Sequence, residues 1–434
     1  MIDKKLINKI MSVGILVLLV GQLPNKIILF YTGISGIYQF FVILMFGIAL
    51  YLEIKRPLIK VSMADMIFAI FFTVILIRMF WEGTTSWLPL LSTFAILPYL
   101  LGRLSSRRFD FNIYSFLYPV VLVTIFIILL QFLRDPNLLS QDRVRLFVTA
   151  YSATGSETQG STQHFSGALF GSAACLSLLA ILLMQNKRIK YNQREMFRHV
   201  IIFFLSLVFL FLVSSKTALI STGLICISLL PLMKSFLRMV KFFLLTSVFF
   251  TIIMVSVNVE RIKFFTDTLN IEGPTVAATV SWNTLNLEQS CFTAERGGSL
   301  LSRLQMNYDA WTLWLNKPFF GNGPGMFGVL DCNWMYDHGS PHNLITHLLA
   351  ELGLTGFALF ALSTLMILVK SRRHYDTFKT LQIKVLLYFT ILQALFIKTG
   401  YLENFQLYFL LGLLAGYSLP APVLADSKSI GKRY

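Results

Sequence analysis

Long apolar runs follow one another along the chain, and short polar connections separate them. A transmembrane helix needs about 20 mostly apolar residues, whereas a transmembrane strand would alternate apolar and polar positions. The runs are continuous, so each predicts a membrane-crossing helix and not a strand of a barrel. The predicted spans are 8–23, 31–53, 64–81, 86–102, 112–133, 166–185, 199–213, 217–233, 242–259, 343–369, 380–397 and 404–422.

Composition supports the same fold class. Hydrophobic residues make up 56% of the 434 residues, and only 13% are charged. The mean hydropathy is +0.69, and a soluble core could not bury that much apolar surface. We therefore predict an all-α, polytopic membrane bundle of about twelve helices, each able to cross roughly 30 Å of hydrocarbon.

The net charge of +16 gives the orientation of the chain. Basic residues gather on alternate connections, and by the positive-inside rule that side is cytoplasmic, so both termini are expected inside. The charge is thus an orientation signal, and we expect no nucleic acid as a partner. The first apolar run lacks a small-residue cleavage site and is expected to be a retained span. The basic clusters are Lys4/Lys5/Lys9, Lys55/Arg56/Lys60, Arg103/Arg107/Arg108, Lys187/Arg188/Lys190/Arg194/Arg198, Lys234/Arg238/Lys241, Lys370/Arg372/Arg373/Lys379 and Lys428/Lys432/Arg433.

Two connections on the opposite side are long, and they divide the chain into three parts. Residues 1–259 hold spans one to nine and include an outer loop at 134–165. Residues 260–342 form a large extracytoplasmic loop of roughly 80 residues, a length that is usually functional. Residues 343–434 hold spans ten to twelve and a cytoplasmic tail.

The large loop contains an amphipathic segment and a turn-rich segment. Residues 302–315 predict a helix with Leu304, Tyr308, Trp311 and Leu315 on one stripe, which either lies on the outer leaflet or packs over the bundle. Residues 316–327 then combine prolines and glycines, which predicts a loop that either cradles a phosphate or turns a corner.

Lys216 interrupts the long apolar stretch 199–233. One straight helix of that length would reach roughly 50 Å, which is too long for a single crossing. We therefore predict two slightly short crossings whose turn lies below the outer surface and holds Lys216 at depth. A cation there is a functional candidate, and snorkelling to lipid headgroups is the alternative.

Further candidates lie around the start of the span at 343–369. His342 can act as a general base near neutral pH or serve only as a helix cap. His347 and Glu351 lie four residues apart on one helix face and are expected to pair, while Gly353 and Gly356 allow close helix packing.

The outer loops also hold candidate anion ligands. Arg303, Arg143 and Arg145 offer forked donors that fit a diphosphate, although an exposed arginine is more often a solvated charge. Asp331, Asp337, His338 and His342 match no metal-ligand spacing, so neither a metal nor a cofactor is expected.

The four cysteines fall into two pairs. Cys175 and Cys226 lie in predicted spans and are interpreted as apolar fillers. Cys291 and Cys332 both fall in the large outer loop, where a disulfide is possible but is not specified by the sequence.

In this order, the motifs resemble those of the bacterial O-antigen ligase and O-antigen polymerase superfamily. The His-Asn pair and the Gly-x-x-Gly pattern that begins ten residues after the Asn are similar to a family motif. The upstream arginine helix and the Pro-x-x-Gly-x-Gly-x-x-x-Phe loop are similar as well. A Ser-Lys-Thr segment stands where many relatives have Ser-Arg-Thr. The matching residues are His342, Asn343, Gly353, Gly356, Arg303, Trp311, Pro318, Gly321, Gly323, Phe327 and Ser215–Leu219.

The resemblance implies a metal-independent glycosyltransferase with a GT-C-like bundle in the bacterial inner membrane, its active site facing the periplasm. The donor would be a glycan on undecaprenyl diphosphate, and a glycan would be the acceptor. Carried over to this sequence, Lys216 and Arg303 would hold the diphosphate, and His342 would activate the acceptor or support the leaving group. Apart from the resemblance, Arg143, Arg145 and Asn343 are the further candidates for substrate binding. Lysine at 216 keeps the charge but loses the bidentate fork of arginine.

Two functions within the family and one outside it remain as alternatives. A polymerase moves the growing glycan onto another lipid-linked repeat unit, and the Phe-rich spans and the Ser-Lys-Thr-Ala-Leu segment favour this function. A ligase moves the polymer onto lipid A–core. A flippase would also suit about twelve spans, but no internal repeat of the kind seen in inverted-repeat transporters is visible. The bilayer and a protein that sets chain length are the further partners expected.

Overall fold

The structure describes most of the predicted helices. The computed structural model describes residues 14, 37–55, 60–106, 113–134, 162–186, 192–213, 215–232, 299–327, 341, 343–373, 378–396, 401 and 404–417. Within these ranges all regular structure is helical, which confirms the predicted all-α class. The predicted spans 8–23, apart from residue 14, and 242–259 lie outside the described residues.

The described helices follow the predicted apolar runs closely. Most begin or end within a few residues of a predicted boundary, because the same polar residues bound the apolar runs and the helices. The helices are α3 (Ile37–Lys55), α4 (Met63–Trp81), α5 (Leu88–Leu91), α6 (Leu97–Ser105), α7 (Ile113–Arg134), α8 (Thr162–Gln185), α9 (Gln193–Leu212), α10 (Lys216–Leu229), α14 (Ser299–Asn316), α16 (Leu344–Arg373), α17 (Phe378–Phe396) and α18 (Phe405–Tyr417). Short segments η1 (Thr85–Trp87) and η2 (Ser92–Ile96) adjoin α5, and η4 (Leu230–Leu232) follows α10.

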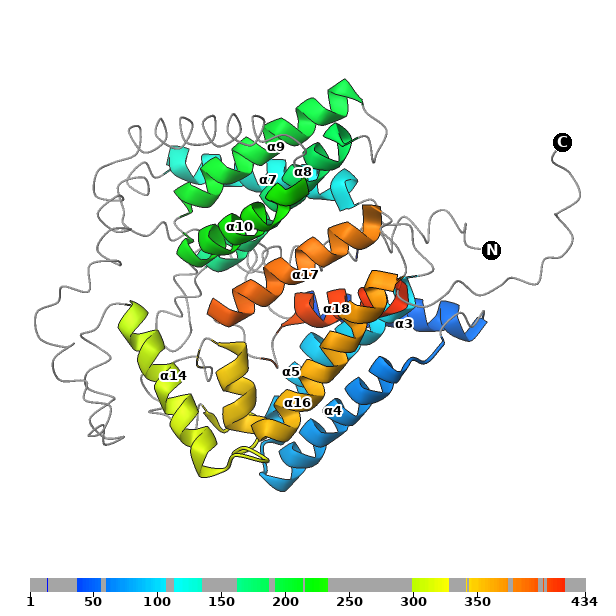
Figure 1. Cartoon of the computed structure of the whole chain (residues 1–434), viewed down its shortest axis with the longest axis vertical. Coiled ribbons are helices and arrows are strands. Elements are labelled where there is room, and N and C mark those ends of the chain that lie inside the picture. The colour runs from blue at the N-terminus through cyan, green and yellow to red at the C-terminus, as the bar shows by residue number, and fades with distance from the viewer. Residues whose placement is uncertain are drawn as a thin grey trace, which may run out of the picture.

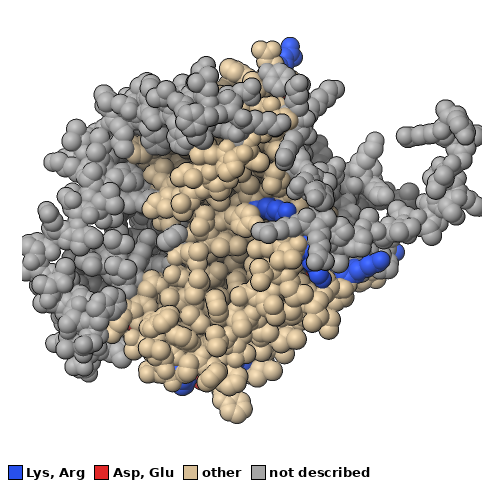
Figure 2. Space-filling model, viewed as in Figure 1, with Lys and Arg blue, Asp and Glu red and all other residues tan. Residues whose placement is uncertain are grey.

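In the described part of the chain, five helical stretches are long and apolar enough to cross a membrane. They are Met63–Trp81, Thr85–Ser105, Ser166–Gln185, Gln193–Leu212 and Leu344–Ser371. Exposed side chains on the outer faces of the bundle are largely apolar, and the face in Figure 2 shows few charges, most of them near its edge. So large an apolar surface suits contact with lipid and not with water. The chain is a multi-pass membrane protein.

The bundle is organised around α8, which packs against α9, α10, α17 and α7 (Figure 1). A second close contact joins α6 to α18. A Cβ on Gly102 would lie 2.3 Å from the carbonyl oxygen of Phe409, and one on Gly412 would lie 2.1 Å from that of Tyr99. Only glycine therefore allows these two helices to approach so closely, as is typical of helix pairs in membranes.

The stretch 199–233 contains two helices, as predicted. The first, α9, ends at Leu212, and α10 begins at Lys216. The first helix starts at residue 193 and not at 199, because the Asn192 side chain accepts a hydrogen bond from the Arg194 amide and caps a polar first turn. Apolar periodicity alone does not detect such a turn.

The predicted span 343–369 corresponds to α16, which bends sharply. Gly353 has φ 65° and ψ −167°, so the helix consists of a first arm (344–352) and a second arm (354–373). In Figure 1 the two arms run in different directions, and α14 and the first arm run across the direction shared by α4, α17 and the second arm. A second arm of this length reaches about 30 Å, enough to cross the hydrocarbon by itself.

The predicted amphipathic helix is α14, and it packs against α16. Its buried face holds Met306, Ala310 and Leu313, which cluster with Phe327 and Ala350. Of the stripe predicted from the sequence, Trp311 and Leu315 are exposed, 46% and 58% respectively. The helix thus packs on the bundle through a different face from the predicted stripe.

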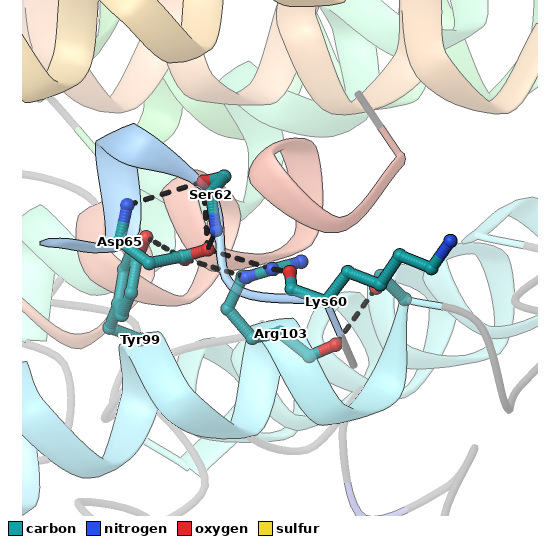
Figure 3. A network of polar contacts seen from close by, with 6 residues as sticks. Lys60, Ser62, Asp65, Tyr99 and Arg103 are labelled. Carbon is teal, nitrogen blue, oxygen red and sulfur yellow. Dashed lines mark hydrogen bonds and ion pairs between the residues drawn. The ribbon is translucent and has the colours of Figure 1, made fainter. Parts of the chain in front are cut away.

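One polar network fastens α4 to α6 (Figure 3). Arg103 donates from Nε to Oδ1 of Asp65 at 2.7 Å and from Nη2 to Oδ2 at 2.8 Å, and also bonds the carbonyl oxygen of Lys60. Asp65 accepts from Tyr99 at 2.7 Å and completes a capping box with Ser62. Arg103 is only 4% exposed, so the bidentate geometry is needed to offset the desolvation of two charges.

We predict that Arg103→Ala lowers the free energy of unfolding by about 3 kcal/mol, because Asp65 is left without its ion partner in a largely buried site. Thermal melting in lipid nanodiscs measures the effect. Adding Asp65→Ala should recover part of the loss, since no unpaired charge remains. The exposed Lys55→Ala is the matched control and should shift stability by less than about 0.5 kcal/mol. Equal losses in both single variants would contradict the prediction.

Candidate functional site

The glycine-rich loop after α14 docks on the bend of α16. The amides of Asn322 and Gly323 donate to the carbonyl oxygens of Ala350 and Glu351 at 2.9 and 2.8 Å. In return, the amides of Leu354 and Thr355 donate to the carbonyl oxygens of Pro318 and Phe319 at 2.8 and 3.0 Å. A break in a helix leaves backbone groups without their usual partners, and the loop supplies those partners on both sides of Gly353.

This docking requires glycine at two facing positions. Gly321 and Gly353 have φ of 66° and 65°, where L side chains are strained. A Cβ on Gly321 would lie 2.4 Å from the backbone of Glu351, and one on Gly353 would lie 2.5 Å from that of Phe319. Gly353, predicted as a helix-packing glycine, thus permits contact between a helix and a loop.

The Glu351 carboxylate lies under the loop and is fully buried. Its Oε2 accepts from the Gly325 amide at 2.8 Å and from the Tyr401 hydroxyl at 2.9 Å, and its Oε1 accepts from the Phe327 amide at 3.0 Å. Three segments distant in sequence therefore meet on one carboxylate. The amides of Gly325 and Phe327 point at protein oxygen, so the described loop turns a corner and does not offer these two donors to a phosphate.

The predicted pairing of His347 with Glu351 is confirmed. Nε2 of His347 lies 3.3 Å from Oε1 of Glu351, although the contact does not have the geometry of a hydrogen bond. The imidazole is 3% exposed and packs edge-on against Tyr401, with ring centroids 5.0 Å apart. The pair adds to the buried polar cluster beneath the loop.

The other side of the loop faces the end of α4. Nη2 of Arg78 donates to the carbonyl oxygen of Gly321 at 3.0 Å, and its Nη1 pairs with Glu82 at 3.0 Å. Trp87 covers the loop so closely that a Cβ on Gly325 would lie 2.2 Å from its Nε1. The loop is therefore held between the bend of α16 and the turn after α4.

The start of α16 is fixed to α14. Oδ1 of Asn343 accepts from the Ile345 amide at 2.9 Å and from the Thr346 amide at 3.4 Å, which makes Asn343 the helix cap. Asn307 of α14 donates from Nδ2 to the carbonyl oxygen of Pro341 at 3.1 Å and accepts from the Thr346 hydroxyl at 2.7 Å. Both chain neighbours of His342 are thus held in place beside α14.

The structure brings some of the predicted site residues together. Arg303 lies one turn before Asn307 on α14, at the end of that helix that bonds Pro341. Lys216 is the first residue of α10, and the starts of α10, α14 and α16 lie on the same, left-hand side of Figure 1. The Arg303 and Lys216 side chains, and all of His342, Arg143 and Arg145, lie outside the described part of the structure.

The candidate metal ligands named from the sequence, Asp331, Asp337, His338 and His342, lie outside the described residues. Among the described residues no group of three or more His, Cys, Asp or Glu side chains could hold a metal ion. The described cysteines, Cys175 and Cys226, are free, whereas Cys291 and Cys332 lie outside the described ranges.

Sequence reasoning missed four residues that hold the loop. The Arg78 and Glu82 pair four apart at the end of a span was a detectable signal, because charges are rare there. Tyr401 and Trp87 gave no comparable signal, since aromatic residues are common throughout this chain.

We predict that Gly353→Ala lowers the free energy of unfolding by at least about 3 kcal/mol, because it adds both backbone strain and a clash with the loop. Gly83→Ala is a matched control, since Gly83 also has positive φ (71°) but open space at its Cβ. That variant should lose only about 1 kcal/mol. Similar melting temperatures for the two variants would show that the docked loop contributes nothing.

Glu351→Ala should lower the free energy of unfolding by about 3–5 kcal/mol, because two backbone amides and a hydroxyl are left buried without an acceptor. Tyr401→Phe removes one donor and should cost about 1 kcal/mol. Glu82→Ala, which breaks a partly exposed pair, should cost about 0.5 kcal/mol or less. Thermal melting in nanodiscs gives this order, and a Glu351 variant as stable as the Glu82 variant would refute the role of the carboxylate.

Comparison with known proteins tests the family resemblance. A search of curated proteins finds no match. Residues 201–361 match the family model Wzy_C, described as O-antigen ligase. The matched segment contains α10, α14, the docked loop, the bend of α16 and the positions of Lys216, Arg303 and His342. The match confirms the motif resemblance to the O-antigen polymerase and ligase superfamily over residues 201–361, a little more than a third of the chain.

Proposed function

We propose that this protein is a glycosyltransferase of the bacterial inner membrane that polymerises undecaprenyl-diphosphate-linked repeat units at the periplasmic face. One observation carries the proposal. Within the family-matched segment, Asn307 of α14 donates to the carbonyl oxygen of Pro341, so the helix that bears Arg303 is fixed beside the residue that precedes His342 in the sequence. This contact supports our proposal that a cation, Arg303, and a general base, His342, act together at one end of this pair of helices.

The chemistry follows from an activated donor. When the sugar–diphosphate bond breaks, its electron pair leaves with the lipid diphosphate, and fixed cations stabilise that charge at a low-dielectric boundary. Arg303 and Lys216 are the proposed cations, with Arg143, Arg145 and Asn343 proposed as further substrate ligands. The donor already carries a good leaving group, so the proposal needs no metal ion and no nucleotide.

His342 is the proposed base for the acceptor hydroxyl. Asn343 supplies the helix cap through its own Oδ1, so capping α16 does not require the imidazole of His342. An imidazole has a pKa near neutrality and can accept the hydroxyl proton as the new glycosidic bond forms. The observation thus supports a chemical role over the capping role for this histidine.

The orientation that we propose has the site at the periplasmic end of a GT-C-like bundle of twelve spans, with both termini in the cytoplasm. In Figure 1 the starts of α14 and α16 lie at the end of the bundle away from α3. The network around Arg103 lies toward that opposite end, where the sequence places the basic connections. A partner that sets chain length belongs to the same proposal.

The second candidate is an O-antigen ligase, and the description of the matched family favours it. A ligase uses the same lipid-diphosphate donor and differs in its acceptor, lipid A–core. The residues proposed to hold the diphosphate would therefore serve either activity. The polymerase and the ligase are therefore distinguished by the acceptor that receives the glycan.

We predict that cells lacking this protein show core plus a single repeat unit on a glycan gel, and that the wild-type gene restores the ladder. His342→Ala and Arg303→Ala should each reduce the ladder at least tenfold at normal protein levels, because a base or a fixed charge typically contributes that much or more. Arg198→Ala removes an exposed cation of α9, outside the proposed site, and is the matched control that should keep the full ladder.

The same gel separates the alternatives. Bare core, with long polymer accumulating on undecaprenyl diphosphate, would identify a ligase instead of a polymerase. Full ladders from both variants would refute the proposed roles of His342 and Arg303.

A further inference from the structure

We propose that the segment from Trp311 to Phe320 lies in the headgroup region of the outer leaflet and anchors the docked loop to the lipid surface. The inference goes beyond the proposed function: contact with the lipid surface follows from geometry and exposure, and only the choice of leaflet rests on the orientation proposed above. Its partner is the bilayer itself, at the boundary between acyl chains and headgroups.

Large apolar side chains of this segment are exposed on a backbone that hydrogen bonds fix in place. Phe319 and Phe320 are 65% and 63% exposed, and Leu315 is 58% exposed on the last turn of α14. They are not loose, because the backbone carbonyl oxygens of Pro318 and Phe319 accept bonds from the second arm of α16. A rigid loop that exposes two adjacent phenyl rings is expected to contact an apolar surface such as the membrane.

The segment continues the lipid-facing surface of α4. Along that candidate span, Ile70 and Ile77 are exposed, and the stripe ends at Phe80 (67%) and Trp81 (80%). Arg78, at the same end, donates to the carbonyl oxygen of Gly321, immediately after Phe320. The two phenyl rings therefore stand beside the point where a membrane-crossing helix ends.

The direction of α14 fits the same position. In Figure 1 it runs across the common direction of α4, α17 and the second arm of α16, as expected for a helix parallel to the membrane surface. Trp311 lies one turn before Leu315, and the exposed Lys317 follows them. Tryptophan and lysine are residues that anchor helices at a lipid headgroup boundary.

The test places a spin label at Phe319 or at Phe320 in the full chain, reconstituted in nanodiscs, after the four native cysteines are replaced. Each position is changed to cysteine in turn, and Leu315→Cys gives a third site on α14. Collision rates with oxygen and with a water-soluble nickel chelate then report the surroundings of the label. The loop is fixed through backbone bonds, so the loss of one ring should leave the fold intact, and thermal melting checks this.

Two reference positions define the scale. Ile70→Cys lies midway along α4 and reports the acyl region, whereas Gln193→Cys lies at the exposed first turn of α9 and reports water. Labels at 319 and 320 should give an oxygen-to-nickel ratio between these references and at least threefold above that of Gln193. A ratio equal to that of Gln193, or low access to both reagents as under a protein partner, would overturn the proposal. Neither outcome depends on whether the protein transfers sugars.

Discussion

A carboxylate without solvent exposure must find its hydrogen-bond partners inside the protein, and in this fold Glu351 finds them in three separate segments. It binds two amides of the glycine-rich loop and the hydroxyl of Tyr401, and it contacts His347 on its own helix. An ionised or polar group with fewer partners at this position would be costly to bury. The loop, the bend of α16 and the segment before α18 are therefore held in one arrangement.

That arrangement explains why α16 bends where it does. At Gly353 the helix gives up its regular backbone bonds, and residues 318–323 replace them on both sides of the bend. The first arm is thereby turned across the bundle and brought against α14, where Asn307 fixes residues 341 and 346. A local exchange of backbone partners thus positions the start of the helix, and with it the neighbours of His342.

The sequence predicted the helices better than their directions. The apolar runs predicted the described helices and the division between α9 and α10, because both depend on local composition. The bend at Gly353 was not predicted, since glycine is also common in straight membrane helices. The sequence predicted one apolar stripe on α14, but α14 packs on the bundle through another face. Which face of a helix is buried depends on the neighbouring elements, and these are not visible in the local sequence. The pairing of His347 with Glu351 followed from helical spacing, whereas Tyr401 enters only through the tertiary fold.

The distribution of polar groups divides the candidate site into two parts with different tasks. Beneath the loop, the donors that contact Glu351 are already used and the side chains are buried, which favours rigidity. At the starts of α14 and α16, the sequence places Arg303 and His342, the residues that we propose contact the substrate. In the proposed reaction, a fixed lower part would let these groups stabilise the charge on a leaving diphosphate with little reorganisation. Under the proposed function, such preorganisation would account for the many hydrogen bonds that hold a loop with no free donor at Gly325 or Phe327.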